Sequence, residues 1–539
     1  MFSHSRRLVW LLLAAGFSCS LMAVATEAAD EQQNSRRLSL FHERRGQHLT
    51  HLRRELSALS EQCHRDGQST LATEVTAVSL ELTAPGTQTP PPILAQLPIS
   101  DRLPEYERIV RNRLQVLRTE KAREMYSLAR KALRDARLPS MAYLLIHDVL
   151  RIHPDHPYAR AVLGQQMFRD PSRRDDPTYA GEWVSRFEAS RRVGQSPEVD
   201  HELYGWIPAS HVSRYEAGQR PWGGRWISQE KEAELRRNFR NAWEIRTEHF
   251  LIKTNTSREE GVELSRRLET YYEWLHTNFA GFFETPAELN RRFEQAQIAG
   301  RRTLPTRPMQ VHYYSDRAEY QARTKGKIPS HIVTNGLFWE PDRTCYLFRN
   351  PDDPDTTTAF HEATHQILDW PTRDHRVSAA RKIQRMRGRR VGEWVLCRNS
   401  NYWVLEGIAC YMESFKIVDG VPQAGDPRNI RFLGATHRLL VDNFYIDLRS
   451  FSSLGKDEYR GHPNHTQLYT QGSGVAHFLL HYKGGLYRDA FIELLSRVYQ
   501  PDMDNLTVDP SLEELTGVPF DVLDLQYREY MGDLALQQQ

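Results

Sequence analysis

Apolar residues recur at helical spacing near the start of the chain. Residues 32–84 carry leucines at positions 49, 52, 56 and 59, three or four residues apart, which places them on one face of a helix. The pattern then breaks, because Pro90, Pro91 and Pro92 are consecutive and cannot continue a helix. The sequence predicts a helical segment at 26–84, followed by a proline-rich linker at 85–104.

Helical periodicity returns over residues 105–164. Eight positions are spaced like one helix–turn–helix unit of the tetratricopeptide type: Tyr126, Ala129, Leu133, Ala142, Leu145, Val149, Leu150 and Pro154. Such units need neighbours to bury their apolar faces, and only one is recognisable. We interpret residues 105–170 as a helical, tetratricopeptide-like module, with binding of a protein partner as one role open to it.

The segment 171–242 is rich in tryptophan, glycine and proline. It contains Trp183, Trp206, Trp222 and Trp226 among short aromatic stretches. Aromatic strands joined by tight turns would give a small β-rich or irregular module. We expect the tryptophans to fill a small core rather than to stack on carbohydrate.

From residue 243 onward, strand and helix patterns mix. Trp243–Thr254 alternates like a strand, and Ser257 is placed to cap a helix that runs to Phe279. Three more strands are predicted, the last two joined by a turn at 340–343: Met309–Tyr314, His331–Phe338 and Thr344–Phe348. We therefore expect an α+β domain at 243–539 in a mainly helical, multi-domain chain.

The N-terminus has the pattern of an export signal. Arg6 and Arg7 precede the apolar run Leu8–Val24, and residues 23–25 form a small-x-small cleavage pattern. We predict a signal peptide at 1–25 and a secreted or periplasmic protein. The alternative is a retained membrane anchor, and Cys19 fits a lipid-attachment site poorly. No second long apolar run follows, so no integral membrane segment is expected in the mature chain.

Length, composition and net charge limit the number of domains and the kinds of binding partner. The chain has 539 residues, 40% of them apolar and 26% charged, as in soluble proteins of two or three domains. The net charge of +2 becomes zero once the signal is removed, so nothing in the overall charge favours nucleic acid. Cys397 and Cys410 bracket Glu406 and could pair in an oxidising compartment, but buried thiols explain them equally well.

The candidate chemistry lies in residues 358–370, which read TAFHEATHQILDW. Residues four apart share a helix face, so His361 and His365 can aim imidazole nitrogens at one metal ion. Glu362 is offset by one residue and can take a proton from a metal-bound water. The pattern predicts a Zn²⁺ site in which Glu362 is the general base.

The third metal ligand must come from elsewhere in the chain. The positions where a metzincin needs glycine and histidine hold Leu368 and Pro371, which excludes that class. Downstream, residues 403–413 form an apolar, helical stretch with one early carboxylate, Glu406, which follows His365 by 41 residues. We expect it to complete a His–His–Glu site. Glu413 lies seven residues after Glu406, on the same helix face, and can orient a histidine. Asp369 is the alternative residue for that role.

The combination HEATH followed by WVLEGIACYME resembles the gluzincins, the peptidase MA-like HExxH zinc metallopeptidases. The resemblance covers at least residues 243–530 and is closest to a secreted group with helical N-terminal regions. It implies a small mixed sheet followed by metal-binding helices. It also implies zinc held by His361, His365 and Glu406, with Glu362 as base.

Related enzymes stabilise the developing oxyanion with a tyrosine or histidine from a later helix. Tyr469 is our candidate for this role and His477 the second choice. By analogy with this fold class, Thr344–Phe348 is expected to be the sheet edge that binds extended substrate.

Two hypotheses about function follow. The first is a secreted zinc peptidase that hydrolyses a peptide or protein substrate; the same centre could also hydrolyse a non-peptide amide. The second is a non-catalytic binding or scaffold protein, with a structural zinc site and a helical module that engages a partner.

Overall fold

The computed structural model describes residues 4–81, 99, 103–173, 176, 179, 181–294, 307–328, 333–387, 396–500 and 510–538. The predicted linker at 85–104 lies almost entirely outside these residues. The first two residues of the strand predicted at 331–338 lie outside them as well. No helix in the described ranges combines the length and the apolar character needed to cross a membrane.

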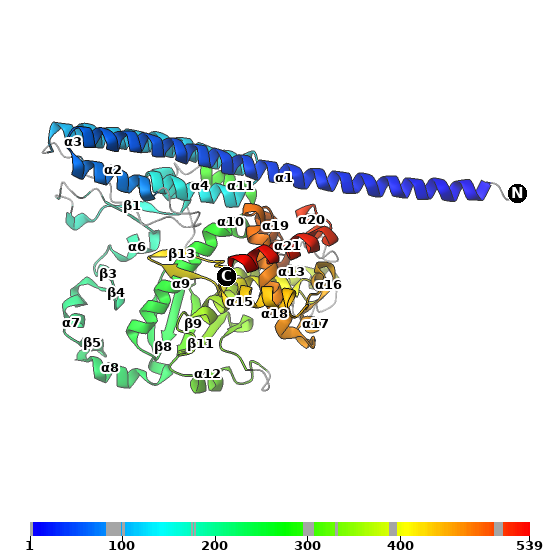
Figure 1. The fold of residues 1–539 in the computed structure, drawn as a ribbon. Helices are drawn as coiled ribbons and strands as arrows, with labels where there is room; N and C mark the ends of the chain where they lie inside the picture. Colours follow the sequence, from blue (N-terminus) through cyan, green and yellow to red (C-terminus); the bar gives the residue numbers. More distant parts are fainter. Residues whose placement is uncertain are drawn as a thin grey trace.

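A group of helices forms the N-terminal part: α1 (His4–Arg65), α2 (Ser69–Glu81), α3 (Glu105–Arg134), α4 (Pro139–Ile152) and α5 (Pro157–Val162). Gly67, at φ 75°, allows the chain to reverse between α1 and α2. The predicted leucines at 49, 52, 56 and 59 are all buried in the shared core. The N-terminal end of α1 projects away from the rest of the molecule (Figure 1).

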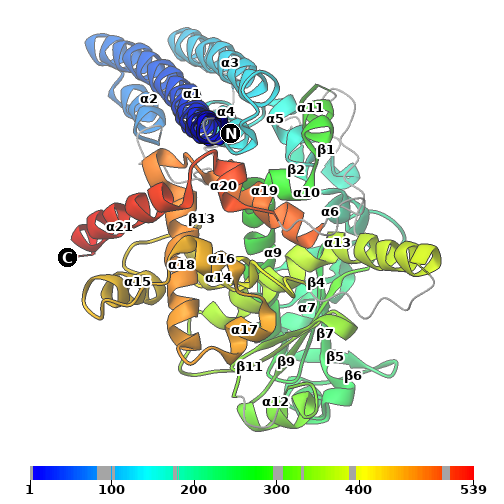
Figure 2. The same cartoon turned by 90° about the vertical axis from the view of Figure 1, so that its right-hand side faces the viewer.

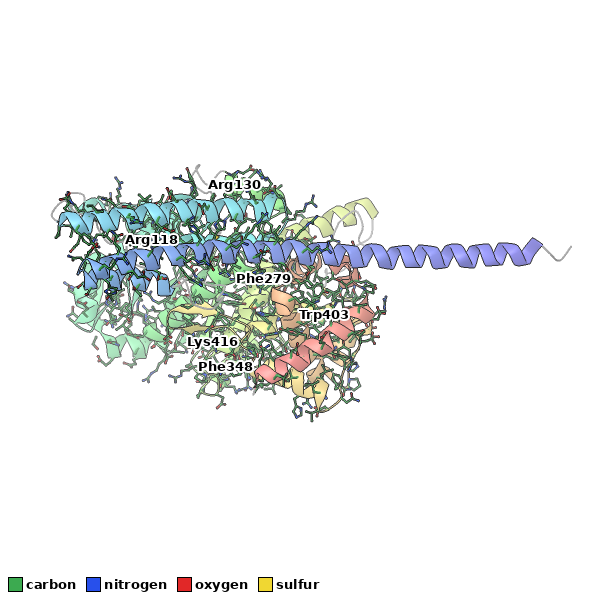
Figure 3. All side chains as sticks on the ribbon, turned by 45° about the horizontal axis from the view of Figure 1, so that its top comes forward. Arg118, Arg130, Phe279, Phe348, Trp403 and Lys416 are labelled. Atoms are coloured by element: carbon green, nitrogen blue, oxygen red, sulfur yellow. The ribbon has the colours of Figure 1, made fainter. Side chains whose placement is uncertain are left out.

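A later helix joins this group. In α11 (Pro286–Glu294), Leu289 and Phe293 enter the same core, and Tyr126 of α3 donates a hydrogen bond to the carbonyl of Phe293. Arg118 and Arg130 lie along α3 in Figure 3. The N-terminal helices are thereby packed against α11, which belongs to the segment of the chain between residues 254 and 309.

Three small hairpins occupy residues 166–228. They pair β1 (Gln166–Phe168) with β2 (Glu182–Val184), β3 (Glu198–His201) with β4 (Gly205–Pro208), and β5 (Gln219–Trp222) with β6 (Arg225–Ser228). Short helices connect them: α6 (Arg186–Arg191), α7 (Val212–Glu216) and α8 (Gln229–Arg236). The small core consists of Tyr204, Ile207 and Tyr215, and Trp226 packs against it only partly buried. Trp226 therefore borders this core rather than filling it, and Trp183, Trp206 and Trp222 are half-buried as well.

The five-stranded sheet is mixed. Its order is β10 (Leu337–Trp339), β11 (Thr344–Phe348), β9 (Met309–Tyr314), β8 (Phe250–Thr254) and β7 (Trp243–Arg246). The three central strands are parallel, and the two outer ones are antiparallel to their neighbours. The single strand predicted at 243–254 is in fact the β7–β8 hairpin, since the chain turns at residues 247–249. The expected α+β class, with a small mixed sheet, is confirmed.

The two faces of the sheet are covered differently. Helices α9 (Arg258–Asn278) and α13 (Thr357–Arg387) cover one face, and α12 (Arg317–Thr324) contacts the other. Ser257 caps α9 as predicted, since its side chain accepts a hydrogen bond from the Glu260 N–H. Cys345 and Leu347 point to the α13 side, whereas Tyr346 and Phe348 belong to a separate aromatic cluster on the other.

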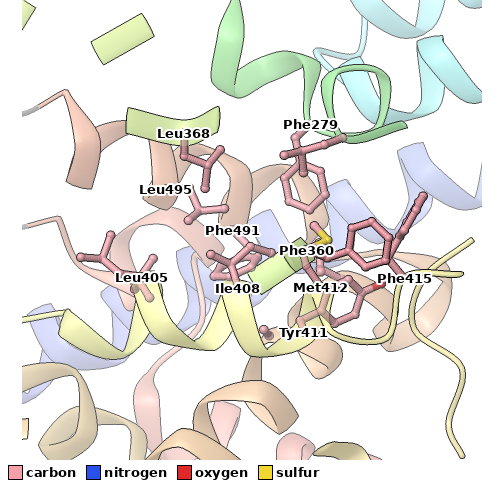
Figure 4. Packing of buried hydrophobic residues seen from close by; sticks show 14 of the residues in the cluster. Phe279, Phe360, Leu368, Leu405, Ile408, Tyr411, Met412, Phe415, Phe491 and Leu495 are labelled. Atoms are coloured by element: carbon pink, nitrogen blue, oxygen red, sulfur yellow. The ribbon is translucent and has the colours of Figure 1, made fainter. Parts of the chain in front are cut away.

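The C-terminal part is a helical assembly around α14 (Tyr402–Met412), all of whose residues are buried. The assembly also contains α10 (Ala280–Phe283), α15 (Ile430–Leu440), α16 (Leu448–Ser453), α17 (Lys456–Gly461), α18 (His465–His481), α19 (Arg488–Tyr499), α20 (Leu512–Thr516) and α21 (Phe520–Gln537). Of these, α16, α17 and α18 pack against α14. A short hairpin, β12 (Lys416–Val418) and β13 (Val421–Gln423), follows α14. Figure 2 shows α18 beside α14, and Figure 4 shows the apolar packing that fixes α14 against its neighbours.

Candidate metal centre

The metal-binding motif lies in the first turns of α13. The Asp353 carboxylate accepts hydrogen bonds from the backbone N–H groups of Thr357 and Thr358, at 2.8 and 2.9 Å. Asp353 therefore caps the helix. The helix continues through Pro371 to Arg387. A regular helix over 357–370 puts His361 and His365 on one face.

Glu406 of α14 lies against both imidazoles. Its Oε2 atom is 3.6 Å from His361 Nε2 and 3.6 Å from His365 Nε2. The ligand atoms of these three residues all lie within 4.8 Å of one another. The structure therefore brings together the three predicted ligands from two helices, although Glu406 follows His365 by 41 residues along the chain.

The distances suit a shared cation better than direct contact. At 3.6 Å, a nitrogen and an oxygen are too far apart for a good hydrogen bond. Zinc ligands lie at about 2.0–2.2 Å from the ion, so two ligands at tetrahedral angles are about 3.4 Å apart. Two imidazoles and one carboxylate are also a common donor set of zinc sites with an open position. The donor chemistry and spacing fit zinc.

The outer side of His361 is oriented by a carboxylate. Glu413 Oε1 lies 2.8 Å from His361 Nδ1, and Arg431 makes a bidentate pair with Glu413 through two 2.7 Å contacts. With Nδ1 bonded to Glu413, the imidazole presents Nε2 to Glu406. Glu413 thus occupies the orienting position.

Asp369, the rival for that role, lies elsewhere. It is 2% exposed and pairs with Arg376, which also donates to Thr372 and to the carbonyl of Tyr499. Asp369 therefore acts inside α13 and at its contact with α19. Arg376 is itself 3% exposed, so its ion pair with Asp369 is buried.

Two further side chains reach Glu406 that the sequence analysis did not single out. Tyr402 donates a 2.6 Å hydrogen bond to Glu406 Oε1, and Arg460 Nη2 lies 3.9 Å from the same oxygen. Tyr402 could have been found, because it precedes Glu406 by four residues, one helical turn, and lies directly before the predicted helical stretch. Arg460 could not, because its approach depends on how α17 packs against α14.

The electrostatics of the centre follow from these contacts. Burial alone would raise the pKa of Glu406, but the two imidazoles facing Oε2 hold that pKa well below its usual range. Burial would lower the pKa of His361, but Cys410, Glu406 and Glu413 together raise it well above its ordinary value. The carboxylates are thus ionised, as ligands and acceptors must be.

Glu362, the predicted base, is held at the end of the sheet. Its Oε2 atom accepts a 2.6 Å hydrogen bond from the Phe338 N–H of β10. Gly336 lies beside it, since a Cβ there would come within 2.9 Å of Glu362 Cγ and 2.7 Å of a Thr358 methyl. The side chain of Glu362 is therefore fixed by strand backbone, and its Oε1 atom has no hydrogen bond among the described residues.

The prediction that Thr344–Phe348 is a sheet edge is wrong, because the neighbouring strand β10 occupies the edge. Thr344–Phe348 is β11, which pairs with β10 on one side and β9 on the other, so its backbone groups are already used. The edge of the sheet is β10, Leu337–Trp339. The sequence could not show this, because β10 is only three residues long and falls at the end of the predicted strand 331–338.

Tyr469 and His477 both lie on α18, but only Tyr469 is near the centre. Tyr469 stacks edge-on with Tyr459 at 5.4 Å; burial and the Glu406 charge raise its pKa. His477 is 2% exposed and bonded to Tyr530 and the carbonyl of Gly425, at 2.7 and 3.1 Å. His477 is therefore a core residue, and the second choice for the oxyanion donor is wrong.

Among the described residues no disulfide joins the cysteines, which are Cys63, Cys345, Cys397 and Cys410. The suggested Cys397–Cys410 disulfide is absent. Cys410 instead lies beside the centre, and its sulfur, an imidazole nitrogen of His361 and a Glu413 oxygen are within 4.8 Å of one another.

Comparison of the chain with protein-family models, with curated proteins and with solved structures gave no match. The function is therefore inferred from the geometry of the centre.

Proposed function

We propose that this protein is a zinc-dependent peptidase that acts outside the cytoplasm, with His361, His365 and Glu406 as metal ligands. The observation that carries the proposal is the pair of 3.6 Å distances from Glu406 Oε2 to the two histidines. An accidental HExxH pattern has no reason to bring a buried carboxylate from another helix to this position.

Each neighbouring group has a role in the proposal. Zinc would supply Lewis acidity, polarising a substrate carbonyl and lowering the pKa of a water molecule. Glu362, fixed through Oε2 by the Phe338 N–H, keeps Oε1 for accepting the proton of that water and passing it to the leaving amine. Glu413 and Arg431 orient His361.

The substrate backbone would lie along β10. The outer side of this strand is the edge of the sheet, and its Phe338 N–H already contacts Glu362. An extended peptide added there would place its carbonyls beside the centre. Tyr469, whose pKa is raised by burial and by the Glu406 charge, would donate to the oxyanion.

The first test is metal content together with Glu362→Gln. We expect purified protein to bind one zinc ion per chain, measured by atomic emission. Glu362→Gln should retain that zinc and lose about 10²–10⁴-fold in hydrolysis of a peptide library. Glu263→Gln, an exposed residue of α9, is the matched control and should retain full activity.

The result also separates the two hypotheses. A folded protein that binds no zinc after loading would rule out the peptidase. Stoichiometric zinc without cleavage of any library peptide would instead favour the scaffold hypothesis, in which zinc is structural.

A further inference from the structure

A pair of cations lies beside the candidate metal centre on one short helix. Arg460 and Lys456 are four residues apart on α17, which packs against α14 and α18 (Figure 2). Residues at this spacing share a helix face. Both therefore lie on the same side of the centre, the side of Glu406 and Tyr402.

Arg460 is anchored but not neutralised. Its guanidinium lies 5.4 Å from the Tyr402 ring centroid and 3.9 Å from Glu406 Oε1, which is beyond hydrogen-bond distance. Among the described residues, Glu406 is the one carboxylate that forms an ion pair with it. The proposed function commits Glu406 to the metal, and 55% of the Arg460 side chain remains exposed.

Lys456 is half-buried and makes no ion pair with any described residue. Burial and the neighbouring Arg460 lower its pKa, while Glu340 and Glu406 act in the opposite direction. Glu340 is already paired with Arg376, at 3.4 Å. Asp457 and Glu458 are exposed on other faces of α17, and Glu458 bonds to the Gly455 N–H. Neither acid of this helix forms an ion pair with Lys456 or Arg460, and the charge of Asp457 has only the smallest of the opposing effects on Lys456.

We infer that Arg460 and Lys456 form a binding site for a substrate carboxylate next to the scissile bond. A guanidinium and an ammonium on the same helix face complement the negative charge and the two oxygens of a carboxylate. One residue of extended peptide spans about 3.3–3.6 Å. A carboxylate bound by an arginine 3.9 Å from a metal ligand therefore belongs to a residue adjoining the bond that is cleaved.

This inference rests on the proposed function and narrows its substrate class. The carboxylate has two sources: the free C-terminus of a peptide, which would make the enzyme a carboxypeptidase, or the side chain of Asp or Glu in an endopeptidase substrate. Both would be recognised by the same pair of cations, so the experiment must separate them.

The test measures binding rather than turnover. Zinc-loaded, full-length protein carrying Glu362→Gln is titrated by fluorescence anisotropy with three dansyl tetrapeptides that differ only at the end. One has alanine with a free C-terminus, one has alanine amide, and one has glutamate amide. We expect the free acid or the glutamate amide to bind about 10- to 100-fold more tightly than alanine amide.

The same titration is repeated in variants. Arg460→Gln and Lys456→Gln should each reduce the preference, and the double variant should abolish it, whereas Arg460→Lys should restore part of it. Arg449→Gln is the control, since Arg449 is an exposed arginine of α16 whose partner is Glu513. Equal binding of all three peptides, or a preference that survives the double variant, would overturn the inference.

The peptidase proposal and the carboxylate-site proposal can fail separately. If the protein bound no zinc and hydrolysed no peptide, but still preferred the carboxylates and lost that preference with Arg460→Gln, the carboxylate site would stand and the peptidase would not. If the protein bound zinc and hydrolysed peptides without any carboxylate preference, the peptidase would stand and the carboxylate site would not.

Discussion

Gly407 of α14 lies against Gly472 of α18, so closely that a Cβ on Gly407 would come within 2.8 Å of the Gly472 carbonyl oxygen. This contact sets the distance between the two helices at the residue next to Glu406. The position of the third metal ligand thus depends on the absence of a side chain beside it.

Gly407→Ala is expected to destabilise the protein by about 1–3 kcal/mol, because the Cβ would meet backbone that cannot move aside. Zinc affinity should fall as well, because displacing α14 moves Glu406. Urea unfolding and competition with a zinc chelator measure the two effects. Gly532→Ala on α21 is the control: nothing lies within 4 Å of its Cβ, and alanine should be neutral or stabilising there.

Glu413→Gln is expected to lower zinc affinity about 10- to 100-fold, because His361 loses the carboxylate that orients it. Asp369→Asn should instead lower stability through its buried pair with Arg376 and leave the zinc affinity of the folded protein unchanged. Chelator competition and thermal unfolding on both variants distinguish the roles. Equal zinc affinity in the wild type and Glu413→Gln would contradict the assignment.

Two tyrosines near Glu406 should differ in effect. Tyr402→Phe removes a hydrogen bond to the ionised ligand and should weaken zinc binding by about 10-fold or more. Tyr469→Phe should keep zinc and lower kcat by about 10²–10³-fold if its hydroxyl meets the oxyanion. Zinc titration and steady-state kinetics on each variant make the comparison. A Tyr469→Phe enzyme with normal kcat would leave Tyr469 as an aromatic neighbour of Tyr459.

Acid should destabilise the fold through buried histidines. Burial lowers the pKa of His477 from 6.5 to about 4; His481 and Arg488 lie nearby, and its hydrogen bonds go to Tyr530 and Gly425. Between pH 6.5 and 4 the unfolded chain takes up a proton that the folded chain does not. The free energy of unfolding should therefore fall with decreasing pH, by up to about 1.4 kcal/mol per pH unit for this group.

His477→Gln tests this by urea unfolding at pH 7 and pH 5. We expect the variant to be less stable at pH 7 but to lose less stability on acidification than the wild type. His147, His156 and His312, whose pKa values are also lowered to about 4, should maintain part of the pH dependence. If the free energy of unfolding fell by the same amount between pH 7 and pH 5 in the variant and in the wild type, His477 would not contribute to the pH dependence.

Local patterns carried much of the fold and the centre. The leucines at helical spacing, the Ser257 cap and the strands 309–314 and 344–348 depend on interactions a few residues apart, which a sequence displays directly. The placement of His361 and His365 on one face of a helix is of the same kind, because the helical period alone determines it. These features follow from the sequence by itself.

Only the tertiary structure decided which distant groups meet. Glu413 rather than Asp369 orients His361, β10 rather than β11 is the edge, and Arg460 reaches Glu406, because of how α13, α14, α17 and the sheet pack together. Those contacts join residues far apart in the chain. They depend on packing at close range, as at Gly407 and Gly472, and no local spacing encodes that.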